Sequence, residues 1–167
     1  AKGILMVWIA QTQGLDAAQQ IVVGVGTIVG HNWPVFLNFH GGRGIATTLG
    51  IITILPLMNK MTPCPTIVLW IILLAGVILT RKTHIPILVG LASLPIVSWA
   101  SRESIPVTLG FLLIFLVIIT KRLTAQPSAE ASKMSKSRLY FNRLLFDRDI
   151  SDNKGWMYRK PVAKQEQ

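Results

Sequence analysis

The chain has 167 residues, of which 51% are hydrophobic and 14% are charged, against roughly 25% charged residues in an ordinary soluble domain. The mean hydropathy is +0.51 and the formal net charge is +10. This composition indicates a membrane protein and argues against a soluble globular domain. The single cysteine, Cys64, excludes a disulfide or a thiolate metal cluster within these residues.

Six apolar segments follow one another along the chain, and we expect each to form a helix. They are apolar nearly all round, as buried or lipid-facing helices are. Most are nearer 16 residues than the ~20 that cross a bilayer, and backbone groups in lipid must bond within the segment, which favours helices. The segments are 3–10, 15–30, 45–58, 66–80, 85–100 and 105–120.

The predicted fold class is therefore an all-α integral membrane protein with about six apolar helices and a basic cytoplasmic tail. The chain opens on Ala1-Lys2-Gly3 without a methionine. We therefore expect a truncated N-terminus and seven helices in the full-length protein. The predicted domains are a polytopic membrane domain over 1–120 and a tail over 121–167.

The tail carries 11 of the 17 Lys and Arg residues and 5 of the 7 Asp and Glu residues. A basic tail after membrane helices favours anionic lipid heads as its partner, not nucleic acid. Residues 121–133 are typical of a linker, and 136–146 is compatible with a short helix at the membrane interface. From residue 151 onward we expect disorder.

Basic residues also set the expected orientation. If six crossings alternate, the tail shares one side with Lys2, Arg43, Arg81 and Lys82, and only Lys60 and Arg102 lie on the other. The first side is then cytoplasmic. The glycine-rich stretch around Arg43, the 81–84 turn and the tail would all face the cytoplasm.

The most distinctive stretch, residues 30–47, reads GHNWPVFLNFHGGRGIAT. Gly41, Gly42 and Gly44 surround Arg43, and Thr47 follows as an apolar segment begins. Glycines allow a tight backbone whose N–H groups converge, and a helix N-terminus adds partial positive charge. Arg can bind two phosphate oxygens at once. We interpret the stretch as a phosphate-binding loop at a membrane surface, although its spacing is not that of a Walker loop.

This stretch resembles the second motif of the bacterial acyl-phosphate-dependent glycerol-3-phosphate acyltransferases. The family pattern is approximately Gly-His-x-Phe-Pro-Val-Phe-Leu-x-Phe-Lys-Gly-Gly-Lys-Gly-Val-Ala-Thr. Trp33, His40, Arg43 and Ile45 replace Phe, Lys, Lys and Val. The positions that match it are Gly30, His31, Pro34, Val35, Phe36, Leu37, Phe39, Gly41, Gly42, Gly44, Ala46 and Thr47.

The resemblance implies a multi-helix enzyme of the bacterial inner membrane that acts early in phospholipid biosynthesis. Such an enzyme transfers a fatty acyl group from acyl phosphate to the 1-hydroxyl of glycerol 3-phosphate, giving lysophosphatidic acid and phosphate. It implies no cofactor, metal, CoA or acyl carrier protein at this step. The implied phosphate-binding residues are His31, Gly41, Gly42, Arg43, Gly44 and Thr47.

Outside this stretch the chain departs from the family pattern. The family's first motif, rich in Ser, Gly and Asn and ending in Arg, would precede Ala1. In the Arg-Tyr-x-Ser stretch Arg81 matches and is a further phosphate-binding candidate, while His84 replaces Ser and is a weak catalytic candidate. In the third motif, Asn142 and Arg143 are weak candidates, because Ser137 and Tyr140 stand where His and Asn are expected.

Simpler interpretations stand beside these. The glycines could form a plain turn, Arg43 could anchor a lipid head, and His31 could be a helix cap. Arg81 could serve only topology, and His40 could be an ordinary surface residue. Residues 138, 142 and 143 fit a solvated or lipid-facing basic helix.

Three functions compete on this sequence. The first is the acyltransferase. The alternative is a non-catalytic membrane relative that binds a phosphorylated lipid or metabolite, which the altered third motif favours. A small transporter ranks last, because it requires a charged residue inside an apolar segment and the six segments have none after their first residues.

Overall fold

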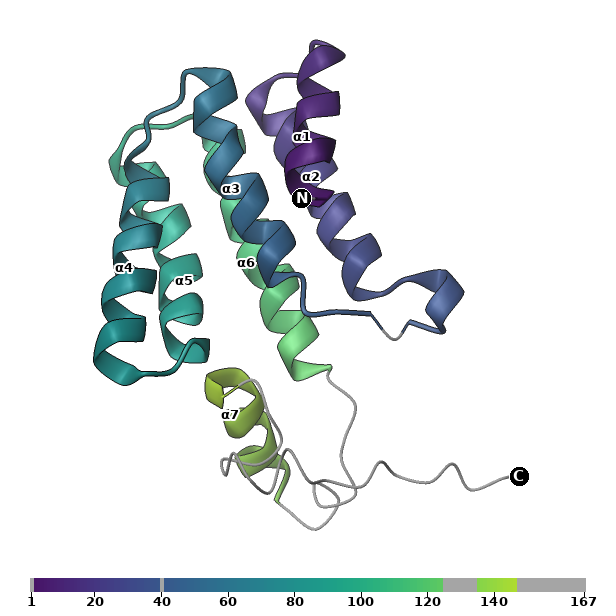
Figure 1. The fold of residues 1–167 in the computed structure, drawn as a ribbon, viewed down its shortest axis with the longest axis vertical. Helices are drawn as coiled ribbons and strands as arrows, with labels where there is room; N and C mark the ends of the chain where they lie inside the picture. The colour runs from purple at the N-terminus through teal and green to yellow at the C-terminus, as the bar shows by residue number, and fades with distance from the viewer. Residues whose placement is uncertain (1, 40, 125–134, 147–167) are drawn as a thin grey trace. The chain divides into compact units, whose positions relative to one another are not determined.

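The computed structural model describes residues 2–39, 41–124 and 135–146, and it divides the chain into two compact units, Ala1–Ile118 and Ile119–Gln167. Every regular element among these residues is helical (Figure 1). The elements are α1 (Lys2–Thr12), α2 (Ala17–Asn32), the short 3-10 helix η1 (Val35–Leu37), α3 (Ile45–Asn59), α4 (Cys64–Thr80), α5 (His84–Ala100), α6 (Ile105–Leu123) and α7 (Lys136–Phe146).

The six helices expected from the apolar segments are confirmed, and so is the helix over 136–146. Several boundaries differ from the expected ones by one or two residues. The largest difference is at α6, which continues to Leu123, three residues into the expected linker. Lys121 and Arg122 occupy its last turn, where positive charge is favourable beside the unpaired carbonyl groups. The rest of that linker and the tail from residue 151 lie outside the described residues.

Two of the helical stretches have the length and hydropathy needed to cross a membrane. They are Ala17–Leu37, with 21 residues and hydropathy 1.2, and Ile105–Leu123, with 19 residues and hydropathy 2.0. The helices α3, α4 and α5 are apolar but shorter. Because every regular element among the described residues is helical, the all-α class is confirmed. Only two stretches meet the length and hydropathy criteria, so six membrane crossings remain a prediction.

Within the first unit, helices approach each other closely at glycines. A Cβ built on Gly3 of α1 would lie 2.3 Å from the carbonyl oxygen of Thr47 in α3, and one on Gly110 of α6 would lie 2.6 Å from Ile21 Cγ2 in α2. Small residues at helix crossings are typical of helices packed within membranes. Further such contacts join Gly24 to Ile51, Gly76 to Pro86 and Gly90 to Leu69.

One apolar core runs through this unit. Its buried members come from each of the helices α1 to α6 and include Ile21 of α2, Ile52 of α3, Leu69 of α4 and Leu94 of α5. Phe111 of α6 is the largest of the fully buried side chains described. Figure 1 shows α4 and α5 as a hairpin beside α3.

A polar cluster joins the first three helices at the end away from the glycine loop. Gln20 is fully buried. Its side-chain amide nitrogen, which carries two N–H groups, lies within hydrogen-bonding distance of three acceptors: the Asn59 Oδ1 at 3.0 Å, the Leu15 carbonyl at 2.7 Å and the Gln11 Oε1. The Asn59 amide donates back to the Gln20 Oε1 at 2.7 Å. At this end Glu103 also accepts a 2.7 Å bond from the Thr62 amide and so ties two connections together.

A proline inside α3 explains one bond between α3 and α4. Pro56 lies within the helix and has no N–H to donate to the carbonyl of Ile52. The Thr66 hydroxyl of α4 donates to that carbonyl at 2.9 Å. A buried acceptor that its own helix leaves unpaired is thus satisfied by the neighbouring helix.

This pairing predicts a coupling between Thr66 and Pro56. Thr66→Val removes the donor and is expected to destabilise the protein by about 1 kcal/mol. In a Pro56→Ala background the restored backbone amide at this position can reach the Ile52 carbonyl, so the same change should cost much less. Unfolding in detergent micelles, followed by circular dichroism, measures both costs. Equal costs in the two backgrounds would contradict this explanation.

Candidate functional site

The glycine stretch lies at the end of α2 and leads directly into α3. The helix α2 ends at Asn32, and the Trp33 amide donates to the Val29 carbonyl at 2.8 Å. After η1 the chain returns along the end of α2, and α3 begins at Ile45 with Gly44 as its N-cap. Gly44 has φ +70°, a conformation that glycine adopts without strain.

Contacts with the end of α2 require glycine at position 41 and leave little room for a side chain at position 42. The Gly42 amide donates to the His31 carbonyl at 3.2 Å. A Cβ on Gly41 would lie 2.2 Å from that same carbonyl oxygen, and a Cβ on Gly42 would lie 2.4 Å from the His31 Nε2. The loop therefore rests on His31, which is half-buried beneath it.

Asn32 is a residue of this region that sequence reasoning missed. Its side chain is fully buried, and a Cβ on Gly44 would lie 2.5 Å from its Oδ1. The neighbouring Thr48 is also fully buried, in the first turns of α3. The sequence did contain a signal for Asn32, because it is a polar residue at the end of an apolar segment and directly follows His31.

The start of α3 is the part of the loop best suited to an anion. Its N-cap residue, Gly44, has no side chain with which to cap it, and the first amides of a helix have no partner within the helix. The Thr48 amide is the first to bond back, to the Gly44 carbonyl at 2.8 Å. Residues 45–47 thus present helix N-terminal amides beside Arg43, which is exposed, and Thr47, which is 7% exposed. Helix N-terminal amides beside a cation are a common setting for anion binding, so a phosphate site here stays a prediction.

Arg81 and His84 lie in the turn between α4 and α5. Since α3 and α4 run in opposite directions, this turn lies at the same end of the first unit as the glycine loop (Figure 1). Arg81 is exposed and has φ +52°, and its amide closes α4 through a 2.9 Å bond to the Val77 carbonyl. His84 is half-buried at the first position of α5.

Asn142 and Arg143 belong to the second unit, whose placement relative to the loop is not defined. The interpretation of these two residues as a solvated or lipid-facing face is wrong, because they are only 7% and 6% exposed. Arg143 Nη1 donates to the Leu123 carbonyl at 3.0 Å, and Arg122 Nη1 donates to the Leu144 carbonyl at 2.8 Å. Each arginine thus bonds a carbonyl near the C-terminal end of the opposite helix, where positive charge is favourable.

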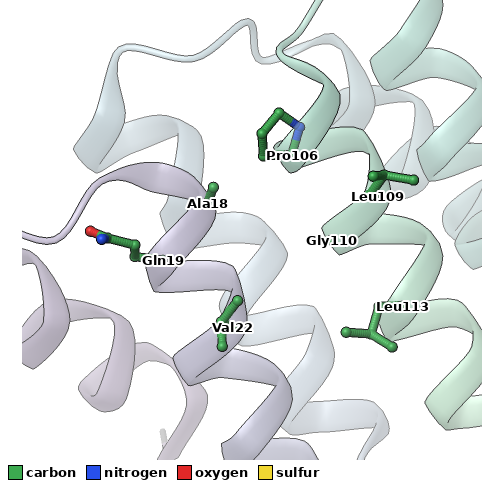
Figure 2. Close-up of a pocket in the computed structure, with 7 residues that line it drawn as sticks. All are labelled: Ala18, Gln19, Val22, Pro106, Leu109, Gly110 and Leu113. Atoms are coloured by element: carbon green, nitrogen blue, oxygen red, sulfur yellow. The ribbon is translucent and has the colours of Figure 1, made fainter.

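A shallow apolar groove of about 370 Å³ lies between the first turns of α2 and α6 (Figure 2). Its lining includes Ala18 and Val22 of α2 and Leu109 and Leu113 of α6. Val22 is nine residues before His31, which is about 14 Å along the helix axis. The groove is therefore separate from the phosphate-binding candidates. Among the residues that the structure describes, no group of three or more His, Cys, Asp or Glu side chains could hold a metal ion.

Comparison with known proteins gives a consistent result. Residues 1–127 match the family model described as glycerol-3-phosphate acyltransferase. The chain is 39% identical to glycerol-3-phosphate acyltransferase 5 of Dehalococcoides mccartyi over 99% of this chain and 71% of that protein. It is 32% identical to glycerol-3-phosphate acyltransferase of Laribacter hongkongensis over 71% of this chain and 58% of that protein. No solved structure gives a significant match.

These findings define an all-helical transferase. The chain belongs to the glycerol-3-phosphate acyltransferase family. The resemblance drawn from residues 30–47 is thereby confirmed at the level of the family. The roles of the individual site residues remain predictions.

The loop geometry predicts opposite outcomes for two glycines. Gly41→Ala places a Cβ against backbone atoms of His31 and Asn32, so it should destabilise the protein by about 1–3 kcal/mol and reduce transferase activity. Gly30→Ala, with open space at that position, should stabilise α2 by about 0.5–1 kcal/mol. Thermal unfolding in detergent and activity assays measure both. Similar behaviour of the two variants would contradict the packing of the loop on α2.

Proposed function

We propose that the protein transfers a fatty acyl group from acyl phosphate to the 1-hydroxyl of glycerol 3-phosphate, and that it releases lysophosphatidic acid and phosphate in phospholipid biosynthesis. Membership of the family supports glycerol 3-phosphate as the acceptor. For acyl phosphate as the donor, the main supporting observation is the N-terminus of α3, which begins at a glycine beside the exposed Arg43. Both substrates carry phosphate, and phosphate is also the leaving group.

The proposed chemistry needs positioning more than activation. The acceptor hydroxyl oxygen attacks the acyl carbonyl carbon, the bond from that carbon to the phosphate oxygen breaks, and the hydroxyl proton is released to the phosphate or to water. A mixed anhydride is already activated, so the protein must hold the two groups together and stabilise charge on the departing phosphate. The amides of residues 45–47 and the guanidinium of Arg43 are suited to this task.

We further propose that the first unit spans the bacterial inner membrane with its six helices, with the glycine loop and the tail on the cytoplasmic side. The distribution of side chains supports this. Leu79, Ile78 and Trp99 are 83%, 76% and 75% exposed, whereas Gln20 and Ser98 are fully buried. Apolar side chains outside and polar ones inside suit a lipid environment. Membrane lipids are then partners of the helix surface.

Two observations support the alternative, a non-catalytic relative that binds a phosphorylated lipid or metabolite. His84 stands where the family pattern has Ser, and Arg143 already bonds a backbone carbonyl. The purified full chain in detergent distinguishes the two functions. Release of phosphate from palmitoyl phosphate only when glycerol 3-phosphate is present supports the transferase. Binding of either compound without turnover supports the alternative.

Arg43 provides the sharpest test of the site. Arg43→Ala should abolish turnover of acyl phosphate, a fall of at least roughly 100-fold, because the leaving phosphate loses its cation. Arg43→Lys should retain part of the activity, since a lysine keeps the charge but not the two-pronged geometry. Phosphate release from palmitoyl phosphate measures both variants.

The matched control is Arg102→Gly. Arg102 is also exposed, lies at the opposite end of the first unit, and has φ +57°, which glycine tolerates. This control should leave turnover unchanged. Normal turnover in Arg43→Ala, or an equal loss in the control, would remove the loop from the proposed site.

The role of the Arg81 side chain can be tested without disturbing the backbone conformation at this position. Arg81→Gly removes the side chain at a residue with φ +52°, so it should leave α4 intact or slightly more stable. If the guanidinium contacts the acceptor, KM for glycerol 3-phosphate should rise by roughly tenfold, a loss of about 1.4 kcal/mol, with kcat little changed. Steady-state kinetics against glycerol 3-phosphate decides this. An unchanged KM would leave Arg81 with a topological role only.

A further inference from the structure

The connection between α2 and the glycine loop exposes a set of apolar side chains. Val35, Phe36 and Phe39 are 68%, 99% and 61% exposed, and Leu37 between them is 62% exposed. We call these four residues the apolar lip. Such exposure has no benefit in water, where burying apolar side chains is favourable.

The backbone holds the lip in this position. The amides of Leu37 and Phe39 both donate to the Pro34 carbonyl, at 3.1 and 3.0 Å, and the Asn38 amide donates to the Val35 carbonyl at 3.2 Å. Phe39 has φ +63°, an uncommon conformation for a bulky residue, which costs free energy. These hydrogen bonds and this backbone conformation therefore hold the apolar turn in an exposed position.

Positive charge accompanies the lip. It is joined directly to the glycine loop with Arg43, and the α4–α5 turn that carries Arg81 lies at the same end of the first unit (Figure 1). Arg43, Arg81 and Lys2 at the start of α1 are all exposed. Gly3 packs against Thr47, which places the start of α1 beside the start of α3. An apolar surface among cations is complementary to an anionic lipid leaflet, with acyl chains beneath negative head groups.

We propose that the apolar lip inserts into the anionic leaflet next to the phosphate-binding loop. Val35, Phe36 and Phe39 then enter the boundary between head groups and acyl chains, while Arg43 stays at the level of the phosphates. The proposal rests on the proposed function for its consequence: a lipid-borne acyl phosphate reaches Arg43 from the leaflet along the lip, whereas glycerol 3-phosphate arrives from water.

Insertion can be measured with a spin label, because Cys64 is the only cysteine in the sequence. The full chain with Cys64→Ser and Phe36→Cys is labelled and reconstituted into vesicles of phosphatidylethanolamine and phosphatidylglycerol. The matched control carries the label at Lys82→Cys, an exposed polar position in the α4–α5 turn. Collision rates with oxygen, which concentrates in lipid, and with a water-soluble nickel chelate are compared.

The label at position 36 should collide with oxygen several-fold more, relative to the nickel chelate, than the label at position 82. A position 36 as open to the chelate as position 82 would overturn the insertion. Protection from both reagents would mean that protein covers the lip, either a second copy or another segment, and would also overturn it. This readout does not depend on activity, so failure of the proposed function is seen separately.

The proposed entry of acyl phosphate along the apolar lip can be tested by comparing KM for the two substrates. Phe36→Ser should raise KM for palmitoyl phosphate presented in vesicles by about tenfold, which corresponds to about 1.4 kcal/mol, and should leave KM for glycerol 3-phosphate unchanged. The control, Leu79→Ser, changes another strongly exposed apolar residue, on α4, and should leave both constants unchanged. Equal effects of Phe36→Ser on the two substrates would overturn the role of the lip in donor entry.

Discussion

The candidate site depends on the close approach of the glycine loop to the end of α2. The loop lies directly on His31 and Asn32, so that side chains at positions 41, 42 and 44 would collide with atoms already there. This contact brings the chain back to the start of α3 and leaves the first amides of that helix without a side-chain cap. The anion-binding geometry therefore follows from packing within the protein and needs no ligand to create it.

The same principle organises the rest of the first unit. A neighbouring helix passes too closely for an unstrained side chain at Gly3 and Gly110, and it leaves little room for one at Gly24. Where helices cannot gain by hiding apolar surface from water, close packing and hydrogen bonds between helices hold them together. The Thr66 hydroxyl on the Ile52 carbonyl and the pairing of Gln20 with Asn59 are bonds of this kind. The exposed apolar side chains of α4 and α5 suit the membrane environment that we propose for this unit.

Much of the fold was accessible from the sequence because apolar segments bounded by short polar connections have few alternatives to helices. The loop was recognisable because its residues recur as one continuous motif. Contacts between distant residues were not accessible. Neither the burial of Asn32 against Gly44 nor the exchange of bonds between Arg122 and Arg143 has a local signature. The end of α6 was misplaced because Lys121 and Arg122 were interpreted as leaving the helix, although a helix C-terminus favours them.

The observed contacts change which groups of the glycine motif are candidates for binding phosphate. The sequence suggested that the amides of the glycines themselves converge on a phosphate. The Gly42 amide is instead bonded to the His31 carbonyl, so it holds the loop and does not offer a hydrogen bond to a substrate. The groups that stay candidates for phosphate binding are the amides in the first turn of α3 and the Arg43 side chain, which lies between Gly42 and Gly44. His31 supports the loop through its contacts with Gly41 and Gly42, so the role that we propose for it is to position the backbone that carries Arg43.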